Sequence, residues 1–290
     1  MAVQAWGDRI TATRVERPGV TVSFDEASVW TGPTEDHLNT AAVAATSLLR
    51  RLDSTAGVHL SIMKGIRAGT GLGSSASSAV AGAMATAGLM GADLDKKVIL
   101  EAALDGEAAA SGARHGDNVL PSLYGGIVLS PSDDPRKYQR INPGFDVYLA
   151  VVLPDVEVLT KEARALLPES VPLADAVRHA SRLGLLIHAL LAGTAADFGQ
   201  SIMTDSLIEP LRAALVDPYP AIRSAALRAG AHGVALSGSG PAMFAVCRDA
   251  DHAKDVAGAM KQACVLEGVS ADVRATAPDI QGARVEKDIQ

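Results

Sequence analysis

The chain has 290 residues, 48% of them hydrophobic and only 3% aromatic, so alanine and branched aliphatic side chains must fill its core. The length fits two domains, and the net charge of −7 disfavours a nucleic-acid-binding or structural module, because nucleic-acid binding needs a basic surface. Two cysteines, Cys247 and Cys264, lack CxxC spacing, and no apolar run has the length of a membrane span. We therefore expect a soluble, cytoplasmic protein.

Strands and helices are expected to alternate in the first half of the chain. The predicted order is strand 9–16, strand 20–24, helix 35–52, strand 58–66, helix 74–90 and a helix that ends near residue 110. Pro18-Gly19 forms the turn between the first two strands, and Asp93 or Asp95 caps the last helix. A turn at 111–112 leads to residues 115–118, and Gly125-Gly126 then opens a short strand.

A polar segment at 131–143, bounded by prolines, predicts a domain boundary, with domains at 1–142 and 143–290. The expected elements beyond it are strand 147–154, helices 159–167, 172–193, 206–215 and 218–229, strands 233–238 and 243–247, helix 251–266 and strand 269–276. Two βα units on an antiparallel sheet indicate an α+β sandwich for this half.

The most informative segment is the glycine-rich loop at 69–77, GTGLGSSAS. Glycines at alternate positions let the backbone pass close to a bulky anion. The serines open a helix whose first N–H groups and dipole attract negative charge, and triphosphate is a common occupant of such sites. The segment matches neither a Walker A loop nor the dinucleotide fingerprint. A loop that only lets a helix pack close to a sheet is the alternative.

Four further segments carry candidate functional residues. A second glycine cluster, SGSGP at 237–241, either closes over a ligand or forms a tight bend before the next strand. Glu107 is either a surface charge or, beside a triphosphate, a Mg²⁺ ligand. His115 and Asn118 would face the same way on a helical turn. Arg164 and Arg212 are either surface charges or a pair that binds a carboxylate.

Taken together, these segments resemble the GHMP small-molecule kinase superfamily and, within it, the homoserine kinases. The resemblance covers nearly the whole chain and is carried by KGIRAGTGLGSSASS at 64–78, GEAAASGARHGDN at 106–118, TKEAR at 160–164, IEPLR at 208–212 and SGSGP at 237–241. It implies a two-domain α+β fold, with ATP bound between the domains. The N-terminal domain would be ribosomal-protein-like, with a left-handed βαβ crossover, and the C-terminal domain ferredoxin-like.

The resemblance also implies a role for each matching residue. The ATP phosphate loop would comprise Arg67, Ala68, Gly69, Thr70, Gly71, Leu72, Gly73, Ser74, Ser75, Ala76 and Ser77. Ser75 and Glu107 would hold Mg²⁺, and Asn118 and Glu107 would be the catalytic residues. Substrate would be bound by His115, Asn118, Thr160, Arg164 and Arg212, with the arginines on its carboxylate and Asn118 near the reacting hydroxyl. The second glycine loop would consist of Ser237, Gly238, Ser239 and Gly240.

The implied activity is ATP-dependent phosphorylation of the L-homoserine hydroxyl on the threonine biosynthesis route, by an enzyme that is often a homodimer. Members of the family open with a strand and a loop of the type PxSxNxGxGFD, and nothing like it precedes Asp8. One alternative is therefore a catalytically impaired relative that only binds a ligand or a partner. Another is a GHMP kinase of different specificity, for shikimate or mevalonate.

Overall fold

The computed structural model describes residues 1–91 and 94–286, without the side chains of Thr160 and Lys161. The described chain divides into two compact units. Unit 1 contains residues 1–68, 73–140 and 279–286, and unit 2 contains Gly69–Leu72 and Ile141–Pro278. The glycine-rich loop is therefore shared, because its tip belongs to unit 2 and its two ends belong to unit 1.

Unit 1 contains a three-stranded sheet of β1 (Arg9–Val15), β2 (Gly19–Phe24) and β3 (Gly57–Met63), in the order β1-β3-β2. β3 pairs antiparallel with β1 and parallel with β2. The predicted turn at Pro18-Gly19 connects two strands that do not pair with each other. β3 is the central strand and is hydrogen-bonded to a neighbouring strand on each edge. Its Val58, Leu60 and Ile62 side chains are buried.

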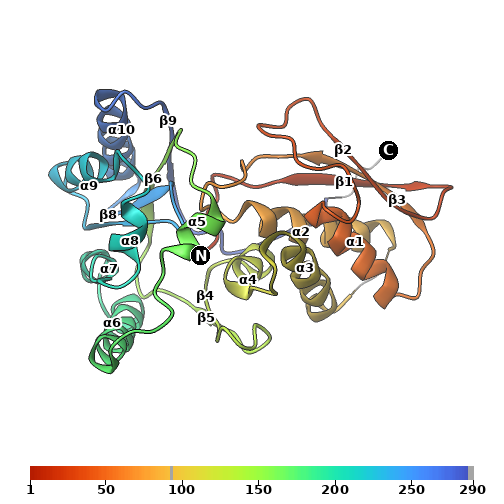
Figure 1. The fold of residues 1–290 in the computed structure, drawn as a ribbon, viewed down its shortest axis with the longest axis horizontal. Helices are drawn as coiled ribbons and strands as arrows, with labels where there is room; N and C mark the ends of the chain where they lie inside the picture. The colour runs from red at the N-terminus through yellow and green to blue at the C-terminus, as the bar shows by residue number, and fades with distance from the viewer. Residues whose placement is uncertain (92–93, 287–290) are drawn as a thin grey trace. The chain divides into compact units, whose positions relative to one another are not determined.

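The unit 1 helices lie along one face of this sheet (Figure 1). They are α1 (Thr40–Arg51), α2 (Ser74–Leu89), α3 (Lys96–Ser111) and α4 (Gly116–Tyr124). Small residues allow close packing, since a Cβ on Gly82 or on Gly106 would lie 2.6 Å from a backbone oxygen of α1. α1 begins at Thr40 rather than at residue 35, because the Asn39 side chain accepts from the Ala41 and Ala42 N–H groups and caps the helix there.

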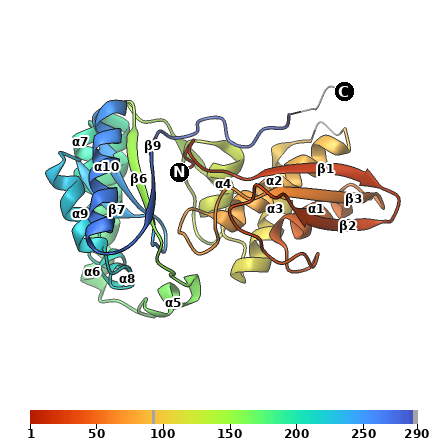
Figure 2. The ribbon, with the colours of Figure 1, turned by 90° about the horizontal axis from the view of Figure 1, so that it is seen from above.

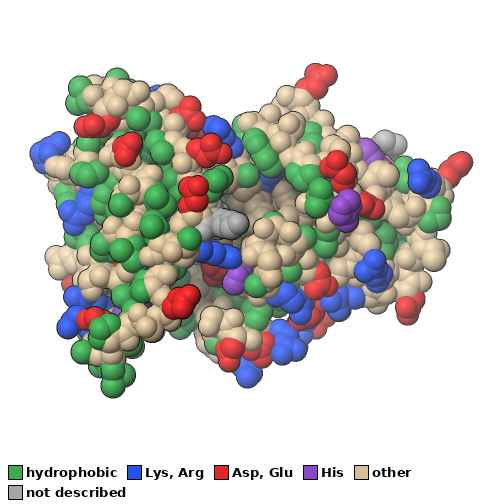
Figure 3. Space-filling view, viewed as in Figure 1, with side chains coloured by type: hydrophobic (Ala, Val, Ile, Leu, Met, Phe, Trp, Pro, Cys, Tyr) green, Lys and Arg blue, Asp and Glu red, His purple; other side chains and the backbone are tan. Residues whose placement is uncertain are grey.

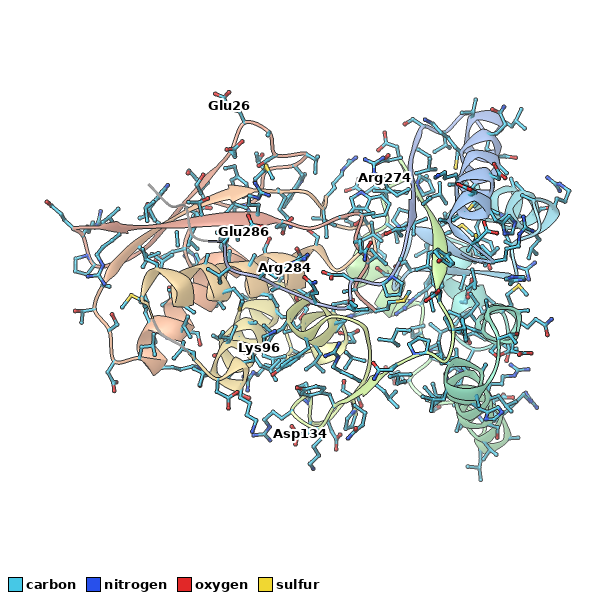
Figure 4. All side chains as sticks on the ribbon, turned by 180° about the vertical axis from the view of Figure 1, so that it is seen from behind. Glu26, Lys96, Asp134, Arg274, Arg284 and Glu286 are labelled. Atoms are coloured by element: carbon cyan, nitrogen blue, oxygen red, sulfur yellow. The ribbon has the colours of Figure 1, made fainter. Side chains whose placement is uncertain are left out.

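Residues 279–286 return to unit 1. Gly126 N donates to Asp279 O at 2.6 Å, Ala283 N donates to Ser122 O at 2.8 Å, and Figure 4 labels Arg284 where this segment runs along the unit. β4 (Ile127–Leu129) pairs with β5 (Gln139–Ile141), a strand that was not predicted. A single boundary between residues 142 and 143 does not reproduce the two units. Two short segments pack with the unit that is remote from them in sequence.

Unit 2 contains a four-stranded antiparallel sheet in the order β7-β8-β6-β9. Its strands are β6 (Tyr148–Pro154), β7 (Gly233–Leu236), β8 (Met243–Cys247) and β9 (Ala271–Thr276). Helices connect β6 to β7 and β8 to β9, which is the split βαβ order of a ferredoxin-like domain. α9 (Tyr219–Arg228) and α10 (Ala250–Leu266) pack on the sheet (Figure 2) around a core that includes Ile222 and Met260.

Four more helices complete unit 2: α5 (Thr160–Ala165), the 20-residue α6 (Leu173–Ala192), α7 (Ala195–Ile202) and α8 (Glu209–Ala213). α7 was not predicted, and Thr194 and Asp197 form a capping box at its start. The helix expected at 206–215 is shorter, because the Asp205 carboxylate accepts from the N–H groups of Leu207, Ile208 and Glu209 and so fixes where α8 begins.

No described helix combines the length and the apolar character that spanning a membrane requires. On the face drawn in Figure 3, acidic and basic side chains are interspersed, and the described side chains there form no continuous basic area.

Candidate active site

The glycine-rich loop leads into the uncapped start of α2. Gly69, Gly71 and Gly73 have φ of +72°, +74° and +72°, a region that L side chains rarely adopt. Gly73 is the N-cap of α2 and has no side chain with which to accept from the first N–H groups of the helix. The head of this 16-residue helix therefore presents backbone donors and the positive end of the dipole to an anion.

Within unit 2, the tip of the loop packs against the second glycine cluster. Ser237 Oγ donates to Gly71 O at 2.9 Å, and Ala242 N donates to Thr70 O at 3.2 Å. A Cβ on Gly71 would lie 2.2 Å from Ser237 O. The cluster therefore contacts the backbone of the glycine-rich loop, in addition to turning the chain toward β8.

Within unit 1, Asn118 lies at the head of α2. A Cβ on Gly73 would be 3.2 Å from both Cβ and Cγ of Asn118, so the amide side chain packs directly on the last glycine of the loop. Asn118 is in the first turn of α4, a helix that the sequence analysis did not predict, and His115 is the N-cap of that helix. The turn that was expected to align these two residues is therefore the start of a helix.

Glu107 is buried, with 6% of its surface exposed, so it is not a solvated surface charge. Its neighbour Gly106 lies at the contact of α3 with α2, where an added Cβ would be 2.9 Å from the Ala79 Cβ. Ala79 is one helical turn beyond Ser75, which is half-buried near the start of α2. The carboxylate and the hydroxyl are hard oxygen ligands of the kind that Mg²⁺ binds, so the donor set fits this ion.

The described residues contain no cluster of three or more His, Cys, Asp and Glu side chains that could hold a metal ion alone. A magnesium ion at Glu107 would therefore take most of its ligands from phosphate oxygens and water, as Mg²⁺ commonly does.

Arg212 lies in unit 2 beside the second glycine cluster. Its Nη1 donates to Gly238 O at 3.0 Å. Glu209, on the same helix, accepts at Oε1 from Tyr219 OH at 2.8 Å and from Leu236 N at 3.0 Å. Burial raises the pKa of Glu209, against the opposing effect of these two donors. These contacts hold α8 to the end of β7.

Arg164 is exposed on α5, and the side chain of the predicted site residue Thr160 lies outside the described residues. The chain just before α5 lies close to the tip of the loop, because a Cβ on Gly69 would be 3.4 Å from Val158 O. Unit 1 thus brings the loop end together with Asn118, and unit 2 brings the loop tip together with the second glycine cluster and Arg212. Arg67 is exposed at the start of the loop.

The sequence analysis gave no role to Asp8 and Lys64, whose side chains form an ion pair and are 0% and 4% exposed. Lys64 was quoted only as the first residue of the segment KGIRAGTG. The available signal was a lysine at the end of an apolar strand and directly before the loop, where a buried ammonium needs a carboxylate.

Unit 2 also contains a cavity of about 760 Å³ between α8 and α9, lined by residues that include Glu209, Tyr219, Arg223 and Arg228. The predicted ATP-binding and substrate-binding residues are not among those that line it. We assign no chemistry to this cavity.

Comparison with known proteins identifies the family. The GHMP kinases N terminal domain model matches residues 39–126, and the GHMP kinases C terminal model matches residues 186–266. A homoserine kinase of Pyrococcus abyssi is 40% identical over 264 residues, covering 89% of this chain and 87% of its own. One from Halobacterium salinarum is 38% identical, covering 91% of this chain and 83% of its own.

Solved structures agree with this assignment. The crystal structure of homoserine kinase from Cytophaga hutchinsonii has a TM-score of 0.89 at 34% identity, covering 97% of this chain and 89% of that one. Mevalonate kinase of L. major has a TM-score of 0.75 at 18% identity, a likeness in fold alone. The expected two-domain α+β fold is thereby confirmed, and the chain belongs to the GHMP kinase family.

Proposed function

We propose that this kinase transfers the γ-phosphoryl group of ATP to the side-chain hydroxyl of L-homoserine, giving O-phospho-L-homoserine and ADP, a step of threonine biosynthesis. The observation that carries the proposal is the 40% identity to a homoserine kinase over 264 residues. Mevalonate kinase, which acts on another small alcohol, shares the fold at 18% identity. A catalytically impaired relative is not favoured, because the loop, the buried Glu107 and the placement of Asn118 suit phosphoryl transfer.

The head of α2 is the proposed site for the phosphates of ATP. N–H groups of residues 73–76, which precede the first N–H bonded within the helix, would donate to phosphate oxygens, and the helix dipole favours the negative charge. Glycines at 69, 71 and 73 let the backbone approach without an intervening Cβ. Because the chain carries a net charge of −7, this local arrangement, rather than the field of the whole protein, must attract the nucleotide.

Ser75 and Glu107 are the proposed ligands of Mg²⁺. When bound, the ion would neutralise charge on the phosphates. Ser75 contributes a hydroxyl at the helix start, and Glu107 contributes a carboxylate held by the packing of α3 on α2. Burial of Glu107 limits its movement, which fixes the position of its oxygens before the nucleotide arrives.

Asn118 is proposed to orient the homoserine hydroxyl. Its amide can accept a hydrogen bond from the hydroxyl, but it cannot take up the proton. Phosphoryl transfer passes through a loose transition state, so positioning and charge neutralisation contribute more than a strong base. Contact of Asn118 with Gly73 sets the amide beside the amides that would hold the phosphates.

The remaining substrate contacts are proposed for His115, Thr160, Arg164 and Arg212. A guanidinium binds a carboxylate through two parallel hydrogen bonds, which suits an amino-acid substrate. Arg212 is held by Gly238 O at one nitrogen, which orients its remaining donors.

A panel of acceptors tests this function. ADP release would be measured with ATP, Mg²⁺ and one acceptor at a time: L-homoserine, D-homoserine, mevalonate or shikimate. L-2-aminobutyrate, which lacks the hydroxyl, is the matched negative control. We expect the highest kcat/KM for L-homoserine and no stimulation by L-2-aminobutyrate. A higher kcat/KM for mevalonate or shikimate would instead assign the chain to another specificity.

A further inference from the structure

We propose that Asp8 and Lys64 are positioning residues for phosphoryl transfer. Their ion pair closes the base of the glycine-rich loop and so holds the first amides of α2 in the geometry that binds phosphate. The proposal rests on the proposed function only in taking the head of α2 as the phosphate site.

Lys64 links the two ends of the loop. Its Nζ donates to Asp8 Oδ2 and, at 3.0 Å, to the carbonyl oxygen of Ser74, the first residue of α2. Lys64 itself stands at the loop entry, directly after β3. One ammonium group therefore contacts the chain both before and after the glycines.

The carboxylate of Asp8 also bonds to the chain both before and after the glycines. Oδ1 accepts from Gly65 N at 3.0 Å and from Ile66 N at 3.3 Å, at the loop entry. Oδ2 accepts from Ser78 Oγ at 2.7 Å, one turn into α2. The Asp8 N–H also donates to Ser77 Oγ at 3.2 Å. The carboxylate thus fixes the distance between the entry strand and the head of the helix.

A third link lies beside these two, because Ser74 Oγ donates to Ile66 O at 2.8 Å. The segment between Ile66 and Ser74 is therefore a loop whose ends are joined by side chains. With its ends fixed, a loop of three left-handed glycines has far fewer conformations to lose when it binds a phosphate.

The chemistry of the pair suits this role better than a role in stability. Replacing a buried ion pair by apolar residues is often neutral or stabilising, so burial of such a pair is weak evidence for a stability function. What apolar residues cannot supply is the set of directional bonds to Gly65, Ile66 and Ser74. Lys64 also cancels the charge of Asp8, which would otherwise repel phosphate at the head of α2. Burial lowers the pKa of Lys64, and Asp8 opposes that shift.

The test separates positioning from stability with the variants Asp8→Asn, Lys64→Met and their combination. Each single variant leaves a buried charge alone, so we expect a lower Tm and weaker ATP binding. The double variant leaves no lone charge, and we expect most of the Tm to return. Asp8→Asn keeps an acceptor for the Gly65 and Ile66 N–H groups, but Lys64→Met removes the bond from Lys64 Nζ to Ser74 O. The Kd for ATP of the double variant, measured by calorimetry without homoserine, should therefore stay raised by about tenfold, with KM for homoserine unchanged.

The pair Asp251 and Lys254 on α10 is the matched control, since the same two residue types form an exposed ion pair. Asp251→Asn with Lys254→Met should alter neither Tm nor the Kd for ATP. The proposal would be overturned if the double variant of Asp8 and Lys64 regained its Tm and bound ATP with the same Kd as the unmodified protein.

Ser78→Ala provides a second measurement if the double variant does not fold. It removes one donor to Asp8 Oδ2 and leaves the ion pair in place. We expect a rise of about threefold in the Kd for ATP, consistent with the loss of one hydrogen bond, and an unchanged Kd would contradict the proposal. Because ATP binding is read without homoserine, failure of the substrate assignment would not affect this result.

Discussion

Units 1 and 2 hold their candidate site residues in different ways. In unit 1, the head of α2 and Glu107 are held by long, closely packed helices and by a buried ion pair. In unit 2, Arg164 and Arg212 lie on α5 and α8, helices of six and five residues. Arg212 is held by a hydrogen bond to Gly238 O, and α8 by the bond that its first residue, Glu209, accepts from Leu236 N.

The two arrangements suit two different requirements, phosphoryl transfer and substrate specificity. Phosphoryl transfer needs groups fixed before the substrates bind, and buried helix packing provides that. Specificity residues on short surface elements can change without disturbing a core. Variants at the head of α2 and at Glu107 should therefore change turnover and nucleotide binding, and variants of Arg164 and Arg212 should change mainly the response to homoserine.

The largest effect is expected from Glu107→Gln, which keeps the shape of the side chain and removes its charge. Turnover should fall by about 10³-fold, since metal stabilisation of the transition state contributes several kcal/mol, while ATP affinity stays largely intact. Titration of kcat with Mg²⁺ measures this. Asp105→Asn, the same charge change on the surface of the same helix, should leave kcat nearly unchanged, and an equal loss there would show that general charge on α3 matters.

Arg212→Ala should cost about 2–5 kcal/mol in homoserine binding, because the substrate carboxylate loses its partner. The measurement is KM for homoserine beside KM for ATP. Arg228→Ala on α9 is the control, since its guanidinium bonds to Ser224 on the same helix. A KM for homoserine that does not rise in the Arg212 variant would remove this residue from the site.

Gly71→Ala and Gly69→Ala form a matched pair at the tip of the loop. Both impose a left-handed backbone on alanine, at about 1–2 kcal/mol. Only the Gly71 variant also places its Cβ 2.2 Å from Ser237 O, whereas the nearest atom at Gly69 is 3.4 Å away. We expect about 2–4 kcal/mol of lost unfolding free energy for Gly71→Ala. Equal losses in urea denaturation would contradict the packing of the loop on the second glycine cluster.

The smallest effect concerns acid stability of α8. Burial of Asp205 opposes its ionisation, but N–H donors from Leu207, Ile208 and Glu209 outweigh it and lower the pKa of the carboxyl below 3.8. The carboxylate therefore stabilises the fold above that pH and loses its effect as pH falls through the lowered pKa. Asp205→Ala should cost about 1 kcal/mol at neutral pH. The difference in urea midpoint between the Asp205 variant and the unmodified protein should narrow below pH 3.8. A difference that does not change with pH would exclude a charged cap.

Long, uninterrupted helices could be predicted from the sequence nearly to their ends, whereas several short elements were missed and others, such as α8, were predicted too long. α2 and α10 were predicted nearly to their ends, because a continuous run of helix-forming residues is closed by glycine or opened by a capping aspartate. α4 was missed because its polar start and Pro121 resemble a loop. α7 was missed although the capping box of Thr194 and Asp197 was visible in the sequence.

Pairings between distant segments lay beyond sequence reasoning. β3 separates β1 from β2, so two consecutive strands that would ordinarily form a hairpin do not pair. In the candidate site, too, contacts between distant residues could not be predicted from the sequence. The glycines, Glu107 and Asn118 stood out by type and spacing, whereas the partnership of Asp8 with Lys64, 56 positions apart, exists only in the folded chain.

The most direct test follows the phosphoryl group itself. The protein would be incubated with Mg²⁺, L-homoserine and ATP labelled at the γ-phosphate, and the products identified by mass spectrometry. Our account predicts that the label appears on the homoserine side-chain oxygen in amounts equal to the ADP formed. Label found only in inorganic phosphate, or on no acceptor while ATP stays bound, would contradict it.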